Sequence, residues 1–104
     1  MENHAKVVII GGGVVGCSLL YHLSKFGLKD CILLERNELT SGSSWHAAGN
    51  VHVISSDPNI SRMMAYTIGL YKEIEKESGH STGFKPSGGF YLASNDVWAE
   101  YLKR

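Results

Sequence analysis

The stretch KVVIIGGGVVG, residues 6–16, decides the fold. Its first half is a short β-branched run, which is typical of a strand buried on both faces of a parallel sheet. Its second half carries the pattern G-x-G-x-x-G at Gly11, Gly13 and Gly16. In dinucleotide-binding folds the first glycine permits a tight turn, the second lets the backbone approach a pyrophosphate, and the third lets the helix pack on the strand. The sequence therefore predicts a phosphate-binding turn between a strand and a helix.

The residues that follow complete a strand–helix–strand unit. Apolar residues recur at helical spacing, at Val15, Leu19, Leu23 and Phe26. Gly27 is placed to end that helix, and a second apolar strand is predicted at 31–34. The whole unit occupies about 30 residues, the size of a right-handed βαβ crossover. We expect strands 6–10 and 31–34 to be parallel neighbours in an α/β, Rossmann-like FAD/NAD(P)-binding fold.

Glu35 ends the second strand, about 20 residues beyond the glycine turn. An acid at this place accepts hydrogen bonds from the ribose hydroxyls of adenosine. Its charge also repels the 2′-phosphate of NADP, which leaves FAD or NAD as the dinucleotide. A glycine-rich turn with no ligand is the alternative interpretation, and the combination of turn and acid favours the ligand.

The composition indicates an ordinary globular sequence with a small-molecule partner. The 104 residues are 43% hydrophobic, and ten Lys and Arg balance ten Asp and Glu, so no net charge attracts nucleic acid or an anionic membrane. No apolar run approaches the roughly 20 residues that span a bilayer, and we expect no membrane insertion. The polar N-terminus, residues 1–5, leaves no room for a signal or transit peptide, which predicts a cytoplasmic protein.

The length predicts an incomplete domain. An enzyme that encloses both a dinucleotide and a substrate needs a longer chain, so we expect residues 1–104 to be the N-terminal part of an FAD-binding domain, with the substrate domain and any folate-binding domain absent. Cys17 and Cys31 show no metal-ligand spacing and no disulfide framework, and we expect both to be reduced core residues. No metal site is predicted.

The chain beyond Glu35 is predicted to contain a long loop and then a helix that serves as scaffold. Residues 36–57 lose periodicity and form a long loop of the kind that often carries function. Asp57 followed by Pro58 predicts a helix start, and Gly79 can end that helix. A strand is predicted at 90–93, followed by a last helix capped by Ser94 or Asn95.

The loop carries a family resemblance. The segment ERNELTSGSSWHAAG, residues 35–49, together with GGGVVG and LLYHLSKFG, resembles the start of the dimethylglycine and sarcosine dehydrogenases, which belong to the D-amino-acid-oxidase-like FAD-dependent oxidoreductases. The resemblance runs through nearly the whole chain. It implies oxidative demethylation of an N-methylated glycine by hydride transfer to flavin, with an electron-transfer flavoprotein as possible acceptor and tetrahydrofolate as a possible cofactor of the missing C-terminal region.

The resemblance also implies which residues line the FAD site. Beside the three glycines of the pattern they are Val14, Val15, Glu35, Arg36, Gly42, Ser43, Ser44, Trp45, His46, Ala47, Ala48, Gly49 and Asn50. The matching histidine of those enzymes carries covalently bound flavin, which implies a flavin link at His46. A neutral imidazole nitrogen is a suitable nucleophile for that link. No catalytic base or substrate clamp can be named among these residues.

Two other functions remain open. In a nicotinamide-dependent dehydrogenase the glycines and Glu35 would serve equally well, but SSWHAAG, residues 43–49, would have no evident role. A non-catalytic relative, like the regulatory subunit of pyruvate dehydrogenase phosphatase, would share the architecture. The sequence does not distinguish dimethylglycine from sarcosine or another methylated amine.

Overall fold

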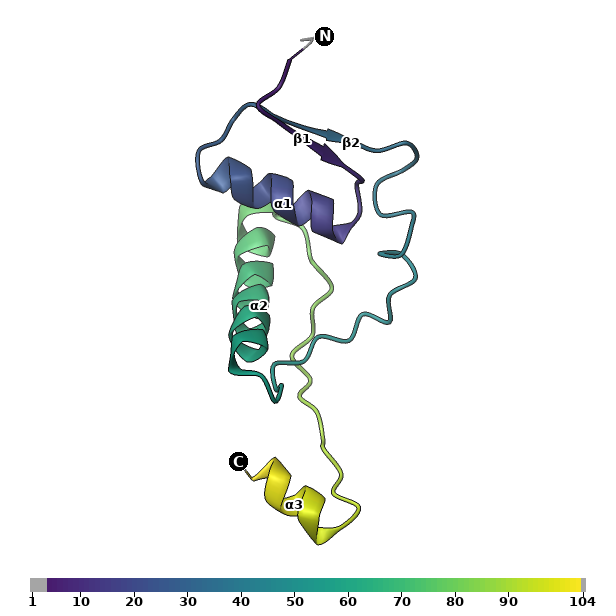
Figure 1. Cartoon of the computed structure of the whole chain (residues 1–104), viewed down its shortest axis with the longest axis vertical. Coiled ribbons are helices and arrows are strands. Elements are labelled where there is room, and N and C mark those ends of the chain that lie inside the picture. Colours follow the sequence, from purple (N-terminus) through teal and green to yellow (C-terminus); the bar gives the residue numbers. More distant parts are fainter. Residues whose placement is uncertain (1–3, 104) are drawn as a thin grey trace. The chain divides into compact units, whose positions relative to one another are not determined.

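The structure of the chain, a computed structural model, describes residues 4–103 (Figure 1). The chain divides into two compact units, Met1–Asn50 and Val51–Arg104. Residues 1–3, part of the N-terminus from which the lack of a targeting signal was predicted, lie outside the described residues. Over the described residues, no helix is both long enough and apolar enough to cross a membrane.

The first unit is the predicted strand–helix–strand unit. It consists of β1 (Val7–Ile10), α1 (Val14–Lys25) and β2 (Cys31–Leu34). The two strands are parallel neighbours with Val7 opposite Cys31 and Ile10 opposite Leu34, which confirms the prediction. Figure 1 shows α1 lying along the strand pair, as a crossover helix does.

The core of this unit lies between α1 and one face of the two strands. Ile9 is the buried residue there, with 6% of its surface exposed, and Val7, Cys31 and Leu33 are half-buried. The alternate residues are exposed, Ile10 to 86%. The expectation that β1 is buried on both faces is therefore wrong for this unit, because α1 is the one helix that the unit supplies to cover the sheet.

The ends and sides of α1 follow the predicted pattern in part. Phe26 ends the helix, and Gly27 follows in the left-handed region with φ of 88°. The residue buried on α1 is Gly16, whereas Val15 and Phe26 of the predicted stripe are about four-fifths exposed, at 79% and 83%. Cys17 and Cys31 are free and half-buried rather than fully buried.

The second unit contains two capped helices. In α2 (Pro58–Ser78) the Asp57 side chain accepts hydrogen bonds from two backbone N–H groups of the first turn, and Gly79 follows the last turn with φ of 70°. In α3 (Asp96–Leu102) the Asn95 side chain accepts from the backbone N–H of Trp98. The predicted starts of both helices and the predicted end of α2 are confirmed.

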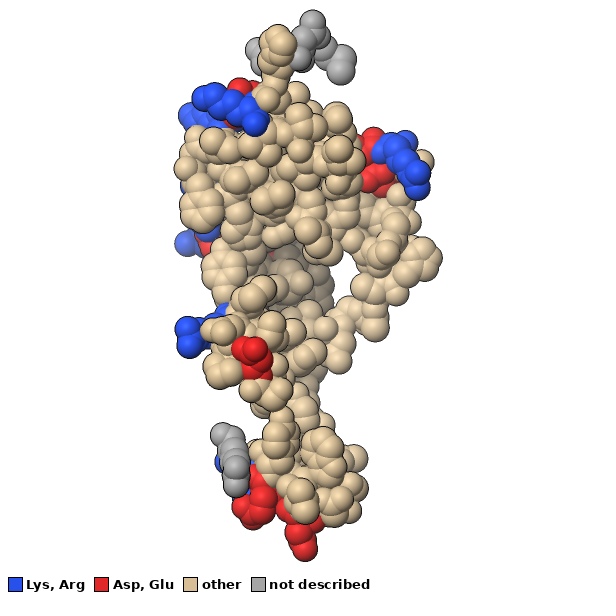
Figure 2. Space-filling model, in the orientation of Figure 1, with Lys and Arg blue, Asp and Glu red and all other residues tan. Residues whose placement is uncertain are grey.

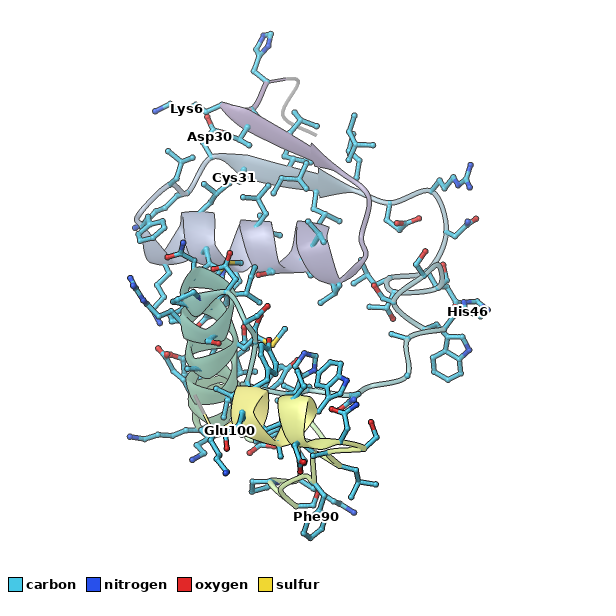
Figure 3. The ribbon with its side chains drawn as sticks, turned by 60° about the horizontal axis from the view of Figure 1, so that its bottom comes forward. Lys6, Asp30, Cys31, His46, Phe90 and Glu100 are labelled. Atoms are coloured by element: carbon cyan, nitrogen blue, oxygen red, sulfur yellow. The ribbon has the colours of Figure 1, made fainter. Side chains whose placement is uncertain are left out.

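The strand predicted at 90–93 is wrong. These residues form no regular structure, and the side chain of Phe90, labelled in Figure 3, is 98% exposed. The aromatic residues Phe90 and Tyr91 suit a strand, but a strand exists only where another strand accepts and donates its backbone hydrogen bonds. Among residues 4–103 no strand pairs with this segment.

Candidate cofactor site

The glycine turn joins β1 to α1 by backbone contacts that leave no room for side chains. Gly11 has φ of 104°, a conformation that favours glycine, and its N–H donates to the carbonyl of Leu34 at 2.8 Å. A Cβ on Gly16 would lie 1.9 Å from the carbonyl oxygen of Gly11. Steric constraints therefore require glycine at positions 11 and 16, as expected if Gly11 forms the tight turn and Gly16 lets the helix pack closely.

Gly12, at the unspecified position of the pattern, is as tightly placed as its neighbours. Its N–H donates to Glu35 Oε2 at 2.7 Å, and its carbonyl accepts from the N–H of Thr40 at 2.9 Å. A Cβ on Gly12 would lie 2.5 Å from Leu39 Cδ2 and 3.1 Å from Glu35 Cβ. Gly12 was not predicted from the sequence to be a site residue. The signal for it was a glycine at the position between Gly11 and Gly13, where the pattern allows any residue.

Glu35 is held in place by backbone donors on both of its oxygens. Oε2 accepts from Gly12, and Oε1 accepts from the N–H of Asn37 at 2.8 Å. The Gly12 hydrogen bond first and the Asn37 hydrogen bond second lower the pKa of the Glu35 carboxyl below its ordinary value. The carboxylate is therefore ionised and oriented at neutral pH, and each oxygen retains a lone pair for a further donor such as a ribose hydroxyl.

The loop after β2 returns to the start of α1. Gly13 precedes the helix and has no side chain to cap it. The hydroxyl of Ser44 takes that role instead, because Ser44 Oγ accepts from the N–H of Val14 at 2.8 Å. A Cβ on Gly13 would lie 3.2 Å from the same oxygen. The first turn of α1 and the Ser-rich loop thus meet at the end of the helix where anions bind.

The loop itself is a succession of turns tied by its own backbone. Thr40 has φ of 64°, an unusual value for a β-branched residue, and its carbonyl accepts from the N–H of Trp45 at 3.0 Å. His46 Nδ1 lies 2.9 Å from the carbonyl oxygen of Gly42. Since a carbonyl can only accept, this contact assigns the hydrogen to Nδ1 and the lone pair to Nε2.

The structure brings some of the predicted site residues together and leaves others at the surface. Gly11, Gly13, Gly16, Glu35 and Ser44 surround the start of α1. The remaining predicted residues are exposed, namely Val14, Val15, Arg36, Gly42, Ser43, Trp45, His46, Ala47, Ala48, Gly49 and Asn50. Figure 3 shows His46 on the loop that leads away from β2. Among residues 4–103 no group of three or more His, Cys, Asp and Glu side chains could hold a metal ion.

On the face shown in Figure 2, the charged side chains of the described residues do not gather in one large patch. On the face in Figure 2 the Lys and Arg residues lie in small separate groups, several of them beside Asp or Glu. This distribution agrees with the balanced composition of ten basic and ten acidic residues.

Comparison with known proteins decides the family. The model of a family described as FAD dependent oxidoreductase matches residues 6–104. The chain belongs to that family. Its description names FAD, so FAD is favoured over NAD as the dinucleotide of the glycine turn. The resemblance to the FAD-dependent oxidoreductases noted in the sequence is thereby confirmed, and the curated relatives of the chain confirm the resemblance to the dimethylglycine and sarcosine dehydrogenases.

Curated relatives of this FAD-dependent oxidoreductase chain are much longer proteins. Mitochondrial dimethylglycine dehydrogenase of Homo sapiens is 44% identical over 102 residues, 98% of this chain and 12% of that protein. Mitochondrial sarcosine dehydrogenase of Homo sapiens is 42% identical over 105 residues, 100% of this chain and 11% of that protein. The mitochondrial pyruvate dehydrogenase phosphatase regulatory subunit of Mus musculus is 39% identical over 104 residues, 100% of this chain and 12% of that protein.

A solved structure supports the fold. Glycine oxidase from Bacillus cereus has a TM-score of 0.69 and 26% identity, with 96% of this chain and 29% of the oxidase covered. The parallel β1–β2 pair with its crossover helix is therefore the start of a glycine-oxidase-like FAD-binding fold, which confirms the predicted Rossmann-like dinucleotide-binding fold. The relatives named above are mitochondrial, so the cytoplasmic location stays a prediction.

Proposed function

We propose that this chain forms the FAD-binding start of an oxidoreductase that demethylates an N-methylated glycine, either dimethylglycine or sarcosine. The observation that carries the proposal is the 44% identity to dimethylglycine dehydrogenase over 98% of the chain. FAD, when bound, supplies a two-electron acceptor for the hydride of an N-methyl carbon. An electron-transfer flavoprotein as final acceptor and tetrahydrofolate as acceptor of the released carbon belong to the same proposal.

The residues at the start of α1 fit the adenosine half of FAD. The glycine turn brings backbone N–H groups and the positive end of the α1 dipole to one place, which suits a pyrophosphate. Glu35, oriented by Gly12 and Asn37, suits the ribose hydroxyls. Ser44 ties the loop of residues 42–50 to the start of α1 by its hydrogen bond with Val14. This tie supports a loop that runs along the cofactor from the adenosine toward the flavin.

His46 has the features that a covalent attachment residue needs. Its side chain is exposed, and its Nδ1–H is held by the carbonyl of Gly42. The free lone pair at Nε2 makes that nitrogen the attachment atom in our proposal. The Gly42 carbonyl would stabilise the positive charge that the ring acquires when Nε2 forms a bond.

We expect His46→Ala to separate FAD binding from FAD attachment in the full-length protein. The substituted protein should keep most of its FAD, because the glycine turn and Glu35 do not involve the imidazole, but it should release that FAD on denaturation. Acid precipitation followed by mass spectrometry of the peptide with Trp45 and His46 measures the attachment. His52→Ala removes an exposed imidazole outside the site and should leave attachment unchanged. A peptide without flavin mass from yellow, active, unsubstituted protein would show that the link is absent.

The activity is tested by anaerobic reduction of the bound flavin. Dimethylglycine or sarcosine added to the full-length protein should bleach the visible flavin absorption, and glycine, which lacks an N-methyl group, should not. A flavin that stays oxidised with every N-methylated glycine contradicts the proposed substrate class.

A regulatory protein is the second candidate, and the 39% identity to the pyruvate dehydrogenase phosphatase regulatory subunit favours it. If the protein is regulatory, methylated amino acids should not reduce the flavin of the full-length protein. The reduction experiment therefore distinguishes the two functions directly.

A further inference from the structure

Ser44 differs from the rest of the loop that carries it. Between residues 41 and 50 it is the one residue that is half-buried, and all others are exposed. Its Oγ accepts from the N–H of Val14, the first residue of α1, at 2.8 Å. This hydrogen bond joins residues 30 positions apart in the sequence. It is the side-chain contact that ties the loop to the helix.

The segment between Thr40 and Ala47 is also tied within itself. Trp45 N–H reaches the carbonyls of Thr40 and Gly42 at 3.0 and 3.1 Å, and His46 Nδ1 reaches the same Gly42 carbonyl at 2.9 Å. A second tie to the glycine turn lies at the start of the segment, where Thr40 N–H donates to Gly12. With its start fixed at Gly12 and its later part fixed by Ser44, the segment has a set position relative to α1.

His46 lies two residues beyond the Ser44 tie. The N–H of Ala47 approaches the carbonyl of Ser44 at 3.5 Å, so the backbone of Ser44 closes the turn that holds His46. The hydroxyl of Ser44 connects that turn to the helix, and its carbonyl lies at the base of the turn. Loss of the hydroxyl would leave the turn formed but free to move away from α1.

We propose that Ser44 is a positioning residue for flavin attachment: through its hydrogen bond to Val14 it holds the His46 turn at a set distance from the phosphate-binding end of α1. This inference rests on the proposed function, because it requires FAD to be joined to His46. In the attachment step one C–H bond of the flavin 8α methyl group would break and a bond between that carbon and Nε2 would form, while the electron pair of the C–H bond would reduce the flavin. Dioxygen would then reoxidise the flavin, and the proton of the C–H bond and the proton of the imidazole ring would end on hydrogen peroxide. Ser44 takes no part in these bonds and acts through the position of His46.

A direct phosphate contact is the competing role for Ser44. Its oxygen accepts from Val14, so its own hydrogen remains available to a phosphate oxygen. Such a contact would raise FAD affinity but would not change how fast bound FAD becomes attached. The rate of attachment at saturating FAD therefore distinguishes positioning from binding.

The experiment adds FAD to full-length apoprotein and follows flavin fluorescence that stays on the denatured polypeptide. For Ser44→Ala we expect an attachment rate at saturating FAD about five- to tenfold below that of the unsubstituted protein, the loss expected from one hydrogen bond. Ser44→Thr keeps a hydroxyl and should restore most of the rate. Ser41→Ala removes a hydroxyl of the same loop that bonds only to the nearby Glu38 carbonyl, and it should attach FAD at the normal rate.

Val14→Pro removes the same hydrogen bond from its other side. Proline is tolerated at the first helical position, and it deletes the N–H while leaving the Ser44 hydroxyl in place. We expect Val14→Pro to slow attachment as much as Ser44→Ala does, and the double variant to slow it no further. This variant keeps the inference testable if Ser44→Ala fails to fold.

The outcomes separate the inference from the function on which it rests. Attachment at the normal rate in both single variants at saturating FAD overturns the positioning role, even if their FAD affinity falls. Unsubstituted protein that never attaches FAD overturns the covalent link itself. Slow attachment in both variants, with Ser41→Ala unchanged, supports the positioning role.

Discussion

At Gly16 even the methyl side chain of alanine would clash with the backbone of Gly11. A Cβ there would lie 1.9 Å from the carbonyl oxygen and 3.1 Å from the carbonyl carbon of Gly11, and 3.4 Å from Ile9 Cγ2. Gly11 is itself bonded to β2, so the clash would push α1 away from both strands. The close packing of helix on turn therefore depends on the absence of one side chain.

We expect Gly16→Ala in the full-length protein to cost about 1–3 kcal/mol of stability and to reduce its FAD content, because the start of α1 moves from its place beside the turn. Chemical unfolding and the ratio of flavin to protein absorbance measure both effects. Gly69→Ala is the matched control, since a Cβ on Gly69 of α2 meets nothing within 4 Å. Normal FAD content in folded Gly16→Ala protein would contradict this packing argument.

Glu35 gives the site a dependence on pH. Its folded-state pKa is lowered, chiefly by the hydrogen bond from Gly12 and then by that from Asn37. A lowered carboxyl pKa contributes stability that is complete above the unfolded value of about 4.3 and is lost as pH falls through the folded-state value. We expect the stability difference between unsubstituted protein and Glu35→Gln to be constant near neutral pH and to shrink in acid. Urea unfolding at a series of pH values measures this difference in the free energy of unfolding. A difference that grows on acidification would contradict a lowered pKa of Glu35 in the folded state.

The helices of the second unit are begun by local side-chain caps. Asp57 Oδ1 accepts from the N–H of Asn59 at 2.7 Å and from that of Ile60 at 3.4 Å, and Pro58 occupies the first helical position. At the other end Glu75 Oε1 accepts from the N–H of Thr82 at 2.8 Å, which ties the last turns of α2 to the residues that follow. These contacts span few positions in the sequence and form without distant partners.

We expect Asp57→Ala to loosen the first turn of α2 by about 1 kcal/mol, which corresponds to roughly fivefold faster amide exchange at Asn59 and Ile60. Hydrogen exchange of the full-length protein, read by mass spectrometry of the peptide around residue 58, measures this change. Asp57→Asn retains an acceptor oxygen and should exchange at nearly the normal rate. Equal exchange in all three proteins would mean that tertiary packing rather than the cap holds the turn.

The whole chain exposes much apolar surface for its size. Among the described residues Ile9 is the single large apolar residue that is buried, while Val8, Ile10, Ile32 and Leu34 of the two strands are all exposed. A pair of strands covered on one face by a single helix has little buried area to offset the entropy of folding.

We expect the 104 residues, produced alone, to bind FAD weakly and to unfold without a sharp transition. Thermal unfolding by near-ultraviolet circular dichroism and fluorescence of an apolar dye measure this behaviour, and the full-length protein is the comparison. A sharp transition with no dye binding would contradict the expectation and would show that the exposed strand face is tolerated in water.

The sequence by itself determined the elements whose causes are local. The β-branched run before Gly11, the three glycines and the apolar run at 31–34 predicted the parallel pair and its crossover helix. Asp57, Pro58 and Gly79 predicted the bounds of α2, because caps and left-handed glycines act over a few residues. Glu35 was predicted to be a site residue from its place at the end of the second strand, whereas its hydrogen bond from the N–H of Gly12 appears only in the folded chain.

The tertiary structure decided what depends on contacts between distant residues. The predicted strand at 90–93 did not form, because pairing requires a partner strand that local composition does not supply. The role of Gly12 depends on Glu35, Leu39 and Thr40, which only folding brings beside it. The cap of α1 comes from Ser44, 30 residues beyond Val14. No periodicity or spacing in the sequence predicts that hydrogen bond, because the hydroxyl reaches the helix only through the turns of the intervening loop.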